Sequence, residues 1–515
     1  MPVKASKASR QLEVERKFDA VESTVPPSFD GIAAVARVEK LPVQSLDAVY
    51  FDTPAQDLAR NRVTLRRRTG GQDPGWHLKL PAGPDARTEL RMPLAPCGGA
   101  AGNTAPTELL DVVLAIVRDR PVEPVAQITT ERESQVLYDG RGVAVAEFCN
   151  DRVTARSSTK CDSSDSDPAA QQWREWELEI VASNGSADRE LLDRLSNRLL
   201  DAGGSPAGHG SKLARVLNVK PAPAGTQPSD PVHRAVAQQV AELLAWDRAV
   251  RADAHDAVHQ MRVTIRKIRS LLRESQDLFG LSDNAWVIDE LRELAGVLGV
   301  ARDAEVLGER YQCELNRLAP ALVRGRVRER LVNDAQRRYQ TGLRRSLVAM
   351  RSQRYFRLLD ALDEMVAIRP AASSGQAVEP VAPVGIEAAY RRVRKAAKAA
   401  NAAAQGDPDD GAQHNEALHQ IRKRAKRLRY TAAATGAKEV SQQAKAIQTL
   451  LGDHQDSVVS RERLIHEANA AHAAGEDTFT YGLLYQREAD LADSCREQLD
   501  AALRKLDKSA RHARR

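Results

Sequence analysis

The sequence is poor in aromatic residues and cysteines and has no long hydrophobic run. Aromatics make up 4% of its 515 residues, so it offers few of the stacking platforms that bind single-stranded nucleic acid. Its five cysteines are scattered and form no CxxC pair, which predicts neither a disulfide framework nor a cysteine-ligated zinc site and is typical of a cytoplasmic protein. No segment resembles a signal peptide or a membrane span, so we expect no membrane partner.

Charge, in contrast, is abundant. Charged residues make up 28% of the chain, and 76 Lys and Arg against 70 Asp and Glu give a net charge of +6. A mildly basic balance favours an anionic partner without identifying it. The length predicts two to four domains.

The pattern of apolar and polar residues divides the chain into two halves. In the first half short runs alternate between apolar and charged residues, and in the second half apolar residues recur with helical spacing. Pro- and Ala-rich stretches separate the parts. The predicted segments are a disordered basic tail (1–10), the alternating half (11–217) with a polar loop insertion (157–170), a linker (218–231), and a helical half (232–510) with lobes 232–368 and 386–510 around a second break (369–385).

The run LEVERKF (12–18) places charged residues at alternate positions. Successive side chains of a strand point to opposite faces, so Glu13, Glu15 and Lys17 share one face. An ordinary solvated strand face is the simplest interpretation. However, the runs VTLRRRT, WHLKL, RTELRM and REWELEIV repeat the pattern, and rows of one sign repel each other unless opposite charges lie among them.

These strands are therefore predicted to close into a barrel whose charged faces line the interior and whose apolar faces meet covering helices. Guanidinium and ammonium groups bind phosphate oxygens. Grouped carboxylates bind hard divalent cations such as Mg²⁺ or Mn²⁺. The expected occupant is a polyanion together with a divalent cation.

The first half resembles the CYTH superfamily, the triphosphate tunnel metalloenzymes. The resemblance rests on an ordered series of short elements over about residues 11 to 217: ExExK at 13–17, YFDTPAQDL, LRRR, WHLKL, RTELR, TTERESQ, AEFCND, WELEI and SKLAR. It implies an eight-stranded antiparallel tunnel that hydrolyses a triphosphate with the help of a metal ion.

The resemblance also implies roles for individual residues. Catalytic roles fall to Glu13, Glu15 and Lys17. Phosphate-binding roles fall to Lys17, Arg66, Arg68, Lys79, Arg87, Arg91, Arg132 and Lys212. Metal-binding roles fall to Glu13, Glu15, Glu89, Glu147, Asp151, Glu175, Glu177 and Glu179.

The helical half carries the same basic stripe twice. In 258–273 and 418–430, basic residues recur every three or four positions, which places them on one face of a helix. A solvated surface is the ordinary explanation, but the interleaved acids that normally pair such a face are missing. The stripes comprise His259, Arg262, Arg266, Lys267, Arg269 and Arg273, and then His419, Arg422, Lys423, Lys426, Arg427 and Arg429.

A Gly and an Asp follow each stripe in the same phase, Gly299 and Asp303 and then Gly452 and Asp456, which predicts an internal duplication and a pseudo-twofold helical bundle. The repeated HxxRxxxRxxR stripe resembles the CHAD family, the conserved histidine α-helical domain. That resemblance covers about 232–510 and implies that the stripes bind inorganic polyphosphate.

Three hypotheses follow. The first is an inorganic triphosphatase that also binds polyphosphate and can associate with polyphosphate granules. The second is an idle barrel serving as a binding module, or a triphosphatase for thiamine triphosphate or another organic triphosphate. The third, RNA 5′-triphosphate processing, is disfavoured because Tyr430 alone stands beside a basic stripe, so no nucleic-acid partner is expected.

Overall fold

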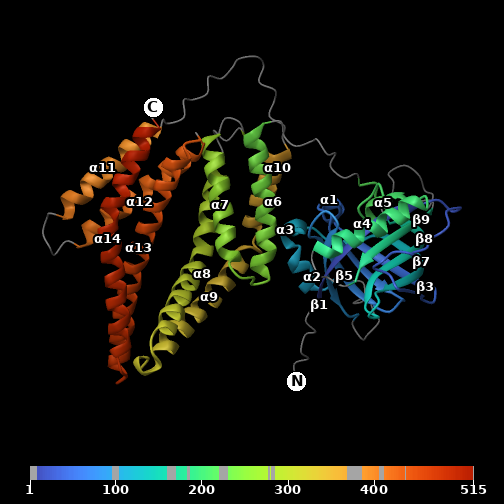
Figure 1. The fold of residues 1–515 in the computed structure, drawn as a ribbon, viewed down its shortest axis with the longest axis horizontal. Coiled ribbons are helices and arrows are strands. Elements are labelled where there is room, and N and C mark those ends of the chain that lie inside the picture. Colours follow the sequence, from blue (N-terminus) through green and yellow to red (C-terminus); the bar gives the residue numbers. More distant parts are fainter. Residues whose placement is uncertain are drawn as a thin grey trace, which may run out of the picture. The chain divides into compact units, whose positions relative to one another are not determined.

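The computed structural model describes residues 9–94, 104–158, 170–181, 186–219, 230–275, 279, 285–367, 386–404, 411–434 and 436–513. They pack into two compact units, one from the described parts of Met1–Ala295 and Leu347–Arg369, the other from those of Gly296–Ser346 and Pro370–Arg515 (Figure 1). Ser9 and Arg10, expected in the tail, begin the first strand. The rest of the tail, most of the loop insertion and of the first linker, and all of 369–385 lie outside the described residues.

Eight strands of the first unit close into one antiparallel barrel, in the order β1-β6-β5-β4-β3-β7-β8-β9 and back to β1. Two short strands are added outside this ring, β2 on β7 and β10 on β1. The barrel confirms the fold class predicted for this half. The strands are β1 Ser9–Ala20, β2 Arg37–Lys40, β3 Gln44–Asp52, β4 Thr64–Thr69, β5 Gly75–Pro81, β6 Ala86–Met92, β7 Glu123–Tyr138, β8 Ala144–Ser157, β9 Gln171–Ile180 and β10 Ser205–Pro206.

The barrel is covered outside by short helices that bury the apolar strand faces. Helix α4 (Ser186–Asp201) packs Leu195 and Leu199 against Trp176 of β9. Helices α2 (Thr107–Val112) and α3 (Leu114–Val117) cover Leu78 of β5 and its neighbours, and α1 (Asp57–Arg60) follows β3. Because apolar and charged residues alternate, this outer burial turns the charged positions inward.

Helix α5 (Lys212–Val216) fills one end of the barrel. Ser211 caps it by accepting a hydrogen bond from the backbone N–H of Ala214. Leu213 and Val216 pack into a cluster with Tyr50, near the end of β3, and with Val125 at the start of β7. The helix thus closes the barrel at the end where β3 finishes.

The rest of the chain is helical. Helix α7 buries Met261, Ile265, Ile268 and Leu272 completely, as the spacing predicts. The helices are α6 Pro231–Arg251, α7 Ala257–Glu274, α8 Ala285–Arg317, α9 Asp334–Ala349, α10 Gln353–Ala367, α11 Ile386–Ala404, α12 Gly411–Ala434, α13 Lys438–Ala473 and α14 Phe479–His512, with a 3₁₀ turn at Pro320–Leu322 and a π turn at Glu329–Asn333.

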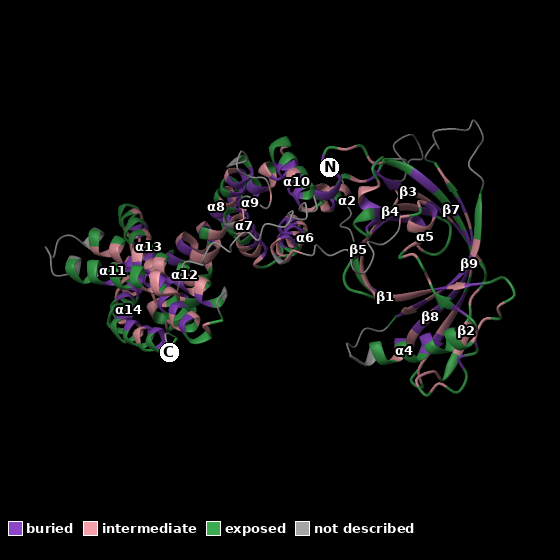
Figure 2. Cartoon of the chain, turned by 90° about the horizontal axis from the view of Figure 1, so that it is seen from above, coloured by how far each residue is buried: buried purple, intermediate pink, exposed green. Residues whose placement is uncertain are grey.

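The second unit takes most of α8 and most of α9 together with α11–α14, so Gly296–Ser346 groups with the C-terminal part of the chain. Helices α8 and α9 approach each other closely at Gly342 of α9. A Cβ at this position would lie 2.7 Å from the backbone nitrogen of Ala301 on α8, so only glycine fits there. Buried residues run along the barrel strands and the inner faces of the helices (Figure 2). None of the described helices combines the length and apolar character needed to cross a bilayer.

Candidate functional site

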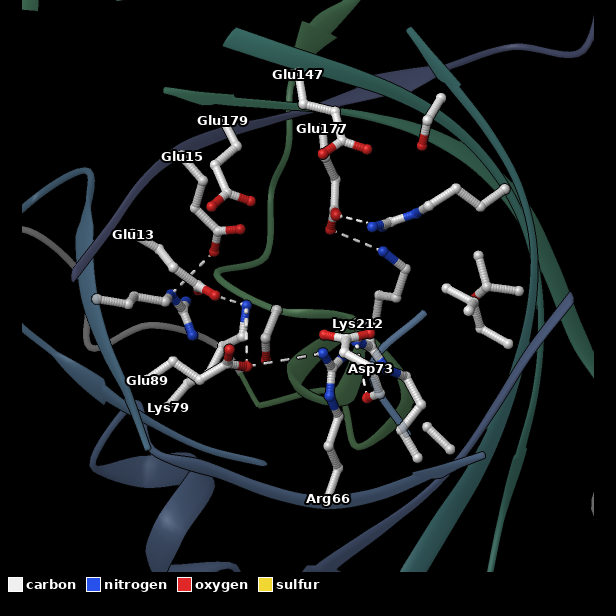
Figure 3. A pocket seen from close by; sticks show the side chains of 18 of the residues that line it. Glu13, Glu15, Arg66, Asp73, Lys79, Glu89, Glu147, Glu177, Glu179 and Lys212 are labelled. Carbon is white, nitrogen blue, oxygen red and sulfur yellow. Dashed lines mark hydrogen bonds and ion pairs between the residues drawn. The ribbon is translucent and has the colours of Figure 1, made fainter. Parts of the chain in front are cut away.

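The barrel interior contains a cavity of about 530 Å³. Charged side chains from seven of the eight barrel strands and from α5 line it, and Figure 3 shows acidic groups along one arc and basic groups facing them. Fourteen of the sixteen residues predicted for the tunnel line this cavity: Glu13, Glu15, Lys17, Arg66, Arg68, Lys79, Arg87, Glu89, Arg91, Arg132, Glu147, Glu177, Glu179 and Lys212. The other two, Asp151 and Glu175, are buried behind them in contact with Lys212.

Strand register creates a row of three carboxylates across the barrel wall. Glu179 of β9 lies directly opposite Glu15 of β1 on one side and Glu147 of β8 on the other. Like charges in directly opposed positions destabilise a sheet. A divalent cation held by oxygen ligands would remove that repulsion, so the chemistry of this row fits a metal site.

The pKa values differ between the acids of this region. Burial, together with neighbouring Glu13, raises the pKa of Glu179 to about 7, and burial also raises the pKa of Glu13. Burial acts on Glu15 in the same direction, but Lys17 and Lys79 outweigh it and lower its pKa to about 2. Glu15 is therefore ionised at neutral pH, while Glu179 is only partly so.

The Glu179→Gln variant is expected to be more stable than the wild type at pH 8 in EDTA, and equally stable near pH 4. Glu179 ionises at a higher pH in the folded chain than its ordinary value of 4.5, so it lowers stability progressively from about pH 4.5 to 7. At pH 8 the melting temperature of Glu179→Gln should exceed that of the wild type by about 2–4 °C for each kcal/mol of repulsion that the substitution removes. The exposed Glu190 supplies a control, Glu190→Gln, which should give no such difference.

A second acidic group lies beside the row. Among the described residues, one trio of acids, Asp151, Glu175 and Glu177, brings ligand oxygens within 4.8 Å of one another and could hold a metal ion. The Lys212 ammonium lies among them, 2.8 Å from Asp151, 2.7 Å from Glu175 and 2.8 Å from Glu177. Lys212, Arg132 and Lys17 already pair with this trio. Among the described residues no ion pair is formed by Glu147 or Glu179, so these two acids of the row have the greater need of a cation.

Facing the carboxylates is a group of buried guanidinium groups. The Nε atoms of Arg66 and Arg68 are buried and have no acceptor among the described residues. Burial, with the like charges of Arg66 and Arg132, lowers the pKa of Arg68 to about 9. Buried donors normally have partners, so these two Nε atoms fit a bound oxyanion.

Other cations of the cavity are held by acids of the wall. Arg132 binds both oxygens of Asp151, at 2.8 and 2.6 Å, and Lys79 Nζ lies 2.6 Å from Glu13. Further pairs are Lys17 with Glu15 and Glu177, Arg87 with Glu15, Arg91 with Glu13 and Glu89, Arg132 with Glu177, and Lys79 and Arg66 with Glu89. These pairs keep the cations in place within the barrel.

The prediction omitted three residues of this region. Tyr50 accepts a hydrogen bond from Arg66 at 3.3 Å, and Asp73, on the β4–β5 loop, pairs with Arg68 and Arg91. His77 is buried, with Nδ1 3.0 Å from Glu89 and Nε2 3.1 Å from the Asp73 carbonyl. Burial and nearby Arg66 lower the pKa of His77 to about 4, although its hydrogen bond to Glu89 acts in the opposite direction. Alternation had placed His77 on the inner face, whereas no pattern marked Asp73.

The first basic stripe lies on α7. Arg266, Lys267 and Arg273 are exposed, and His259, Arg262 and Arg269 are half-buried above the apolar face. Burial and the like charges of Arg273 and Arg292 lower the pKa of Arg269. Lys267 has a distant partner in Glu242, at 3.9 Å.

The second stripe lies on α12. Lys423 and Arg427 are exposed, and His419, Arg422, Lys426 and Arg429 are half-buried. Arg429 donates to Gln448 of α13 at 3.3 Å, and the Arg422 guanidinium lies beside Gly452, also on α13. In the described part of the chain, no acid forms an ion pair with Arg422, Lys423 or Arg427.

Comparison with known proteins agrees with both halves. Residues 11–206 match the CYTH domain and residues 234–465 match the CHAD domain. "Uncharacterized protein Rv2226" of Mycobacterium tuberculosis is 71% identical over 521 residues, which cover 100% of both chains.

Two solved structures are also similar. PptA from Streptomyces chartreusis is 18% identical, covering 54% of this chain and 100% of its own, with a TM-score of 0.42. The CHAD domain from the plant Ricinus communis is 23% identical, covering 53% of this chain and 90% of its own, with a TM-score of 0.36.

Proposed function

The chain belongs to the family in which a CYTH domain precedes a CHAD domain, and from this premise we propose that it is a metal-dependent hydrolase of inorganic triphosphate. The observation that carries the proposal is that one cavity brings together guanidinium groups with unpartnered Nε atoms and a row of opposed carboxylates. A linear triphosphate with a divalent cation matches both sets of charges.

The chain's own residues would act mainly by positioning and by neutralising charge. Arg66, Arg68 and Arg132 would bind non-bridging phosphate oxygens and stabilise the charge that shifts to the leaving phosphate as the anhydride bond breaks. Because these groups are buried and held by the barrel wall, they need little rearrangement when substrate binds.

Glu15, Glu147 and Glu179 would hold a divalent cation, for which we propose Mg²⁺ or Mn²⁺, with Glu13 and Glu89 beside them. When bound, such an ion would neutralise phosphate charge and lower the pKa of bound water. Lys17 and Lys79, each paired with an acid of this region, would orient those carboxylates and contact phosphate.

The cavity favours an inorganic substrate over thiamine triphosphate or a nucleotide. Of the described residues that line it, Tyr50 is the single aromatic, and its hydroxyl is engaged with Arg66. An organic triphosphate would call for aromatic side chains on which its ring could stack. The alternative of an idle barrel is disfavoured because acids and bases line the cavity together.

Purified full-length protein is expected to release phosphate from triphosphate with Mg²⁺ and to lose this activity in EDTA. Thiamine triphosphate and ATP should be hydrolysed at least 10-fold more slowly, because Tyr50 is the single aromatic side chain among the described residues that line the cavity. Phosphate release can be followed with a colorimetric assay. If phosphate were released from all three compounds only at the uncatalysed rate, the barrel would be a binding module. If an organic compound were hydrolysed faster than triphosphate, that compound would be the substrate instead.

We further propose that the stripes on α7 and α12 bind inorganic polyphosphate. Rows of Arg and Lys at one-turn spacing suit a flexible chain of repeating phosphates better than a single pocket does. Affinity that is electrostatic in origin falls with salt. By this route the protein would associate with polyphosphate granules in the cytoplasm.

A further inference from the structure

One acidic side chain at the rim of the cavity has no part in the proposed catalytic arrangement. Asp73 belongs to the loop between β4 and β5 and lines the cavity. One of its oxygens pairs with Arg68 and the other lies 3.4 Å from Arg91 (Figure 3 places Asp73 beside the basic groups). The Asp73 carboxylate thus pairs with two cations, Arg68 and Arg91, that could otherwise bind phosphate oxygens.

The loop holds Asp73 in this place by backbone packing. Gly70 and Gly71 have φ angles of +76° and +70°, which favour glycine. A Cβ at Gly70 would lie 2.4 Å from the carbonyl oxygen of Ser45, so the loop is pressed against the start of β3. His77 also contacts the Asp73 carbonyl, at 3.1 Å. The carboxylate is therefore presented at the rim by a tightly fitted loop.

The two ends of the barrel differ. Helix α5 packs where β3 finishes, beside Tyr50 and Val125, whereas the Asp73 loop lies beside Ser45 where β3 begins. A linear phosphate lying along the cavity would meet α5 at one end. Further phosphates would then extend past Asp73, and each carries negative charge that the carboxylate repels.

From this arrangement, and resting on the proposed function, we propose that Asp73 is a specificity-determining residue that restricts hydrolysis to short linear phosphates. A triphosphate is short enough to be held by the cations of the cavity. A longer chain must place an anionic unit against Asp73 or displace it from Arg68 and Arg91. Long polyphosphate would then be held by the helical stripes without being degraded in the tunnel.

The test compares chain lengths in full-length protein with the Asp73→Asn variant, which keeps the shape and removes the charge. The matched control is Asp85→Asn, on the next hairpin, because Asp73 and Asp85 have equally exposed side chains (36%) and Asp85 pairs with Arg16, outside the cavity lining. Phosphate release from triphosphate, tetraphosphate and long-chain polyphosphate gives kcat/KM for each.

The wild type and Asp85→Asn are expected to prefer triphosphate strongly. Asp73→Asn should raise kcat/KM for long-chain polyphosphate relative to triphosphate by about 10-fold or more, as expected when a like charge is removed from a partly buried site. An unchanged ratio in Asp73→Asn, or a wild type that hydrolyses long chains as well as triphosphate, would overturn this inference alone. No hydrolysis of any chain length by any of the three proteins would overturn the proposed function and this inference together.

Discussion

Replacing Glu15 by glutamine is expected to lower the rate of triphosphate hydrolysis by roughly two to three orders of magnitude, the loss typical when one charge-stabilising group of an active site is removed. Glu15 has a low pKa, about 2, so the change removes a full negative charge from the carboxylate row. The barrel should remain folded, because Lys17 keeps Glu177 as a partner and Arg87 keeps the Gly210 carbonyl. Steady-state phosphate release at saturating Mg²⁺ measures the effect.

Two further measurements separate a metal-site role from general damage. Mg²⁺ should raise the melting temperature of the wild type and have a much smaller effect on Glu15→Gln, since ligand binding to the folded state stabilises it. Polyphosphate binding by the helical half should be unchanged. Glu190→Gln, which removes an exposed acid from α4, should behave as wild type in every assay. Normal turnover by Glu15→Gln would refute the assigned role.

Neutralising either basic stripe is expected to weaken binding of long-chain polyphosphate by roughly 100-fold, taking about 1 kcal/mol for each cation near an anionic surface. The variants are Arg266→Gln with Arg269→Gln and Arg273→Gln on α7, and Arg422→Gln with Lys423→Gln and Arg427→Gln on α12. Triphosphate turnover should persist in both, because none of these residues lines the tunnel cavity. Fluorescence titration of labelled polyphosphate at several salt concentrations provides the affinities.

The salt dependence distinguishes contact with the stripe from the effect of net charge. By analogy with nucleic acids, the slope of log affinity against log salt should fall by about one for each phosphate contact removed. The control triple Arg337→Gln, Arg344→Gln and Arg345→Gln removes the same charge from exposed positions of α9. If it weakened binding as much as the stripe variants do, binding would depend on total charge and the stripes would have no special role.

The inner face of the tunnel could be predicted because strand geometry has a period of two. Trp76, Leu78 and Leu80 face outward and are buried, which leaves His77 and Lys79 to face inward. Helical spacing gave the corresponding result on α7, where the apolar positions are completely buried. In both cases neighbouring residues of one element decide the orientation, so no knowledge of distant segments was needed.

The pairings between strands could not be predicted in this way. That Glu147, Glu179 and Glu15 form one row depends on the register of β8 with β9 and of β9 with β1. A shift of register by one residue would place Glu15 and Glu147 opposite apolar residues of β9 and would break up the row. The placement of Lys212 among three acids likewise depends on how α5 packs into the barrel end.

By itself, the order of residues determined which side chains of each strand and helix share a face, and hence that acids and bases would line an interior in alternation. Only the tertiary structure decided which acid meets which base, which carboxylates lie opposite one another, and that Asp73 reaches the rim to pair with Arg68. The physical reason is that the periodicity of the backbone over a few residues sets the side to which a side chain points. The electrostatic partner of that side chain depends on contacts between segments far apart in the chain.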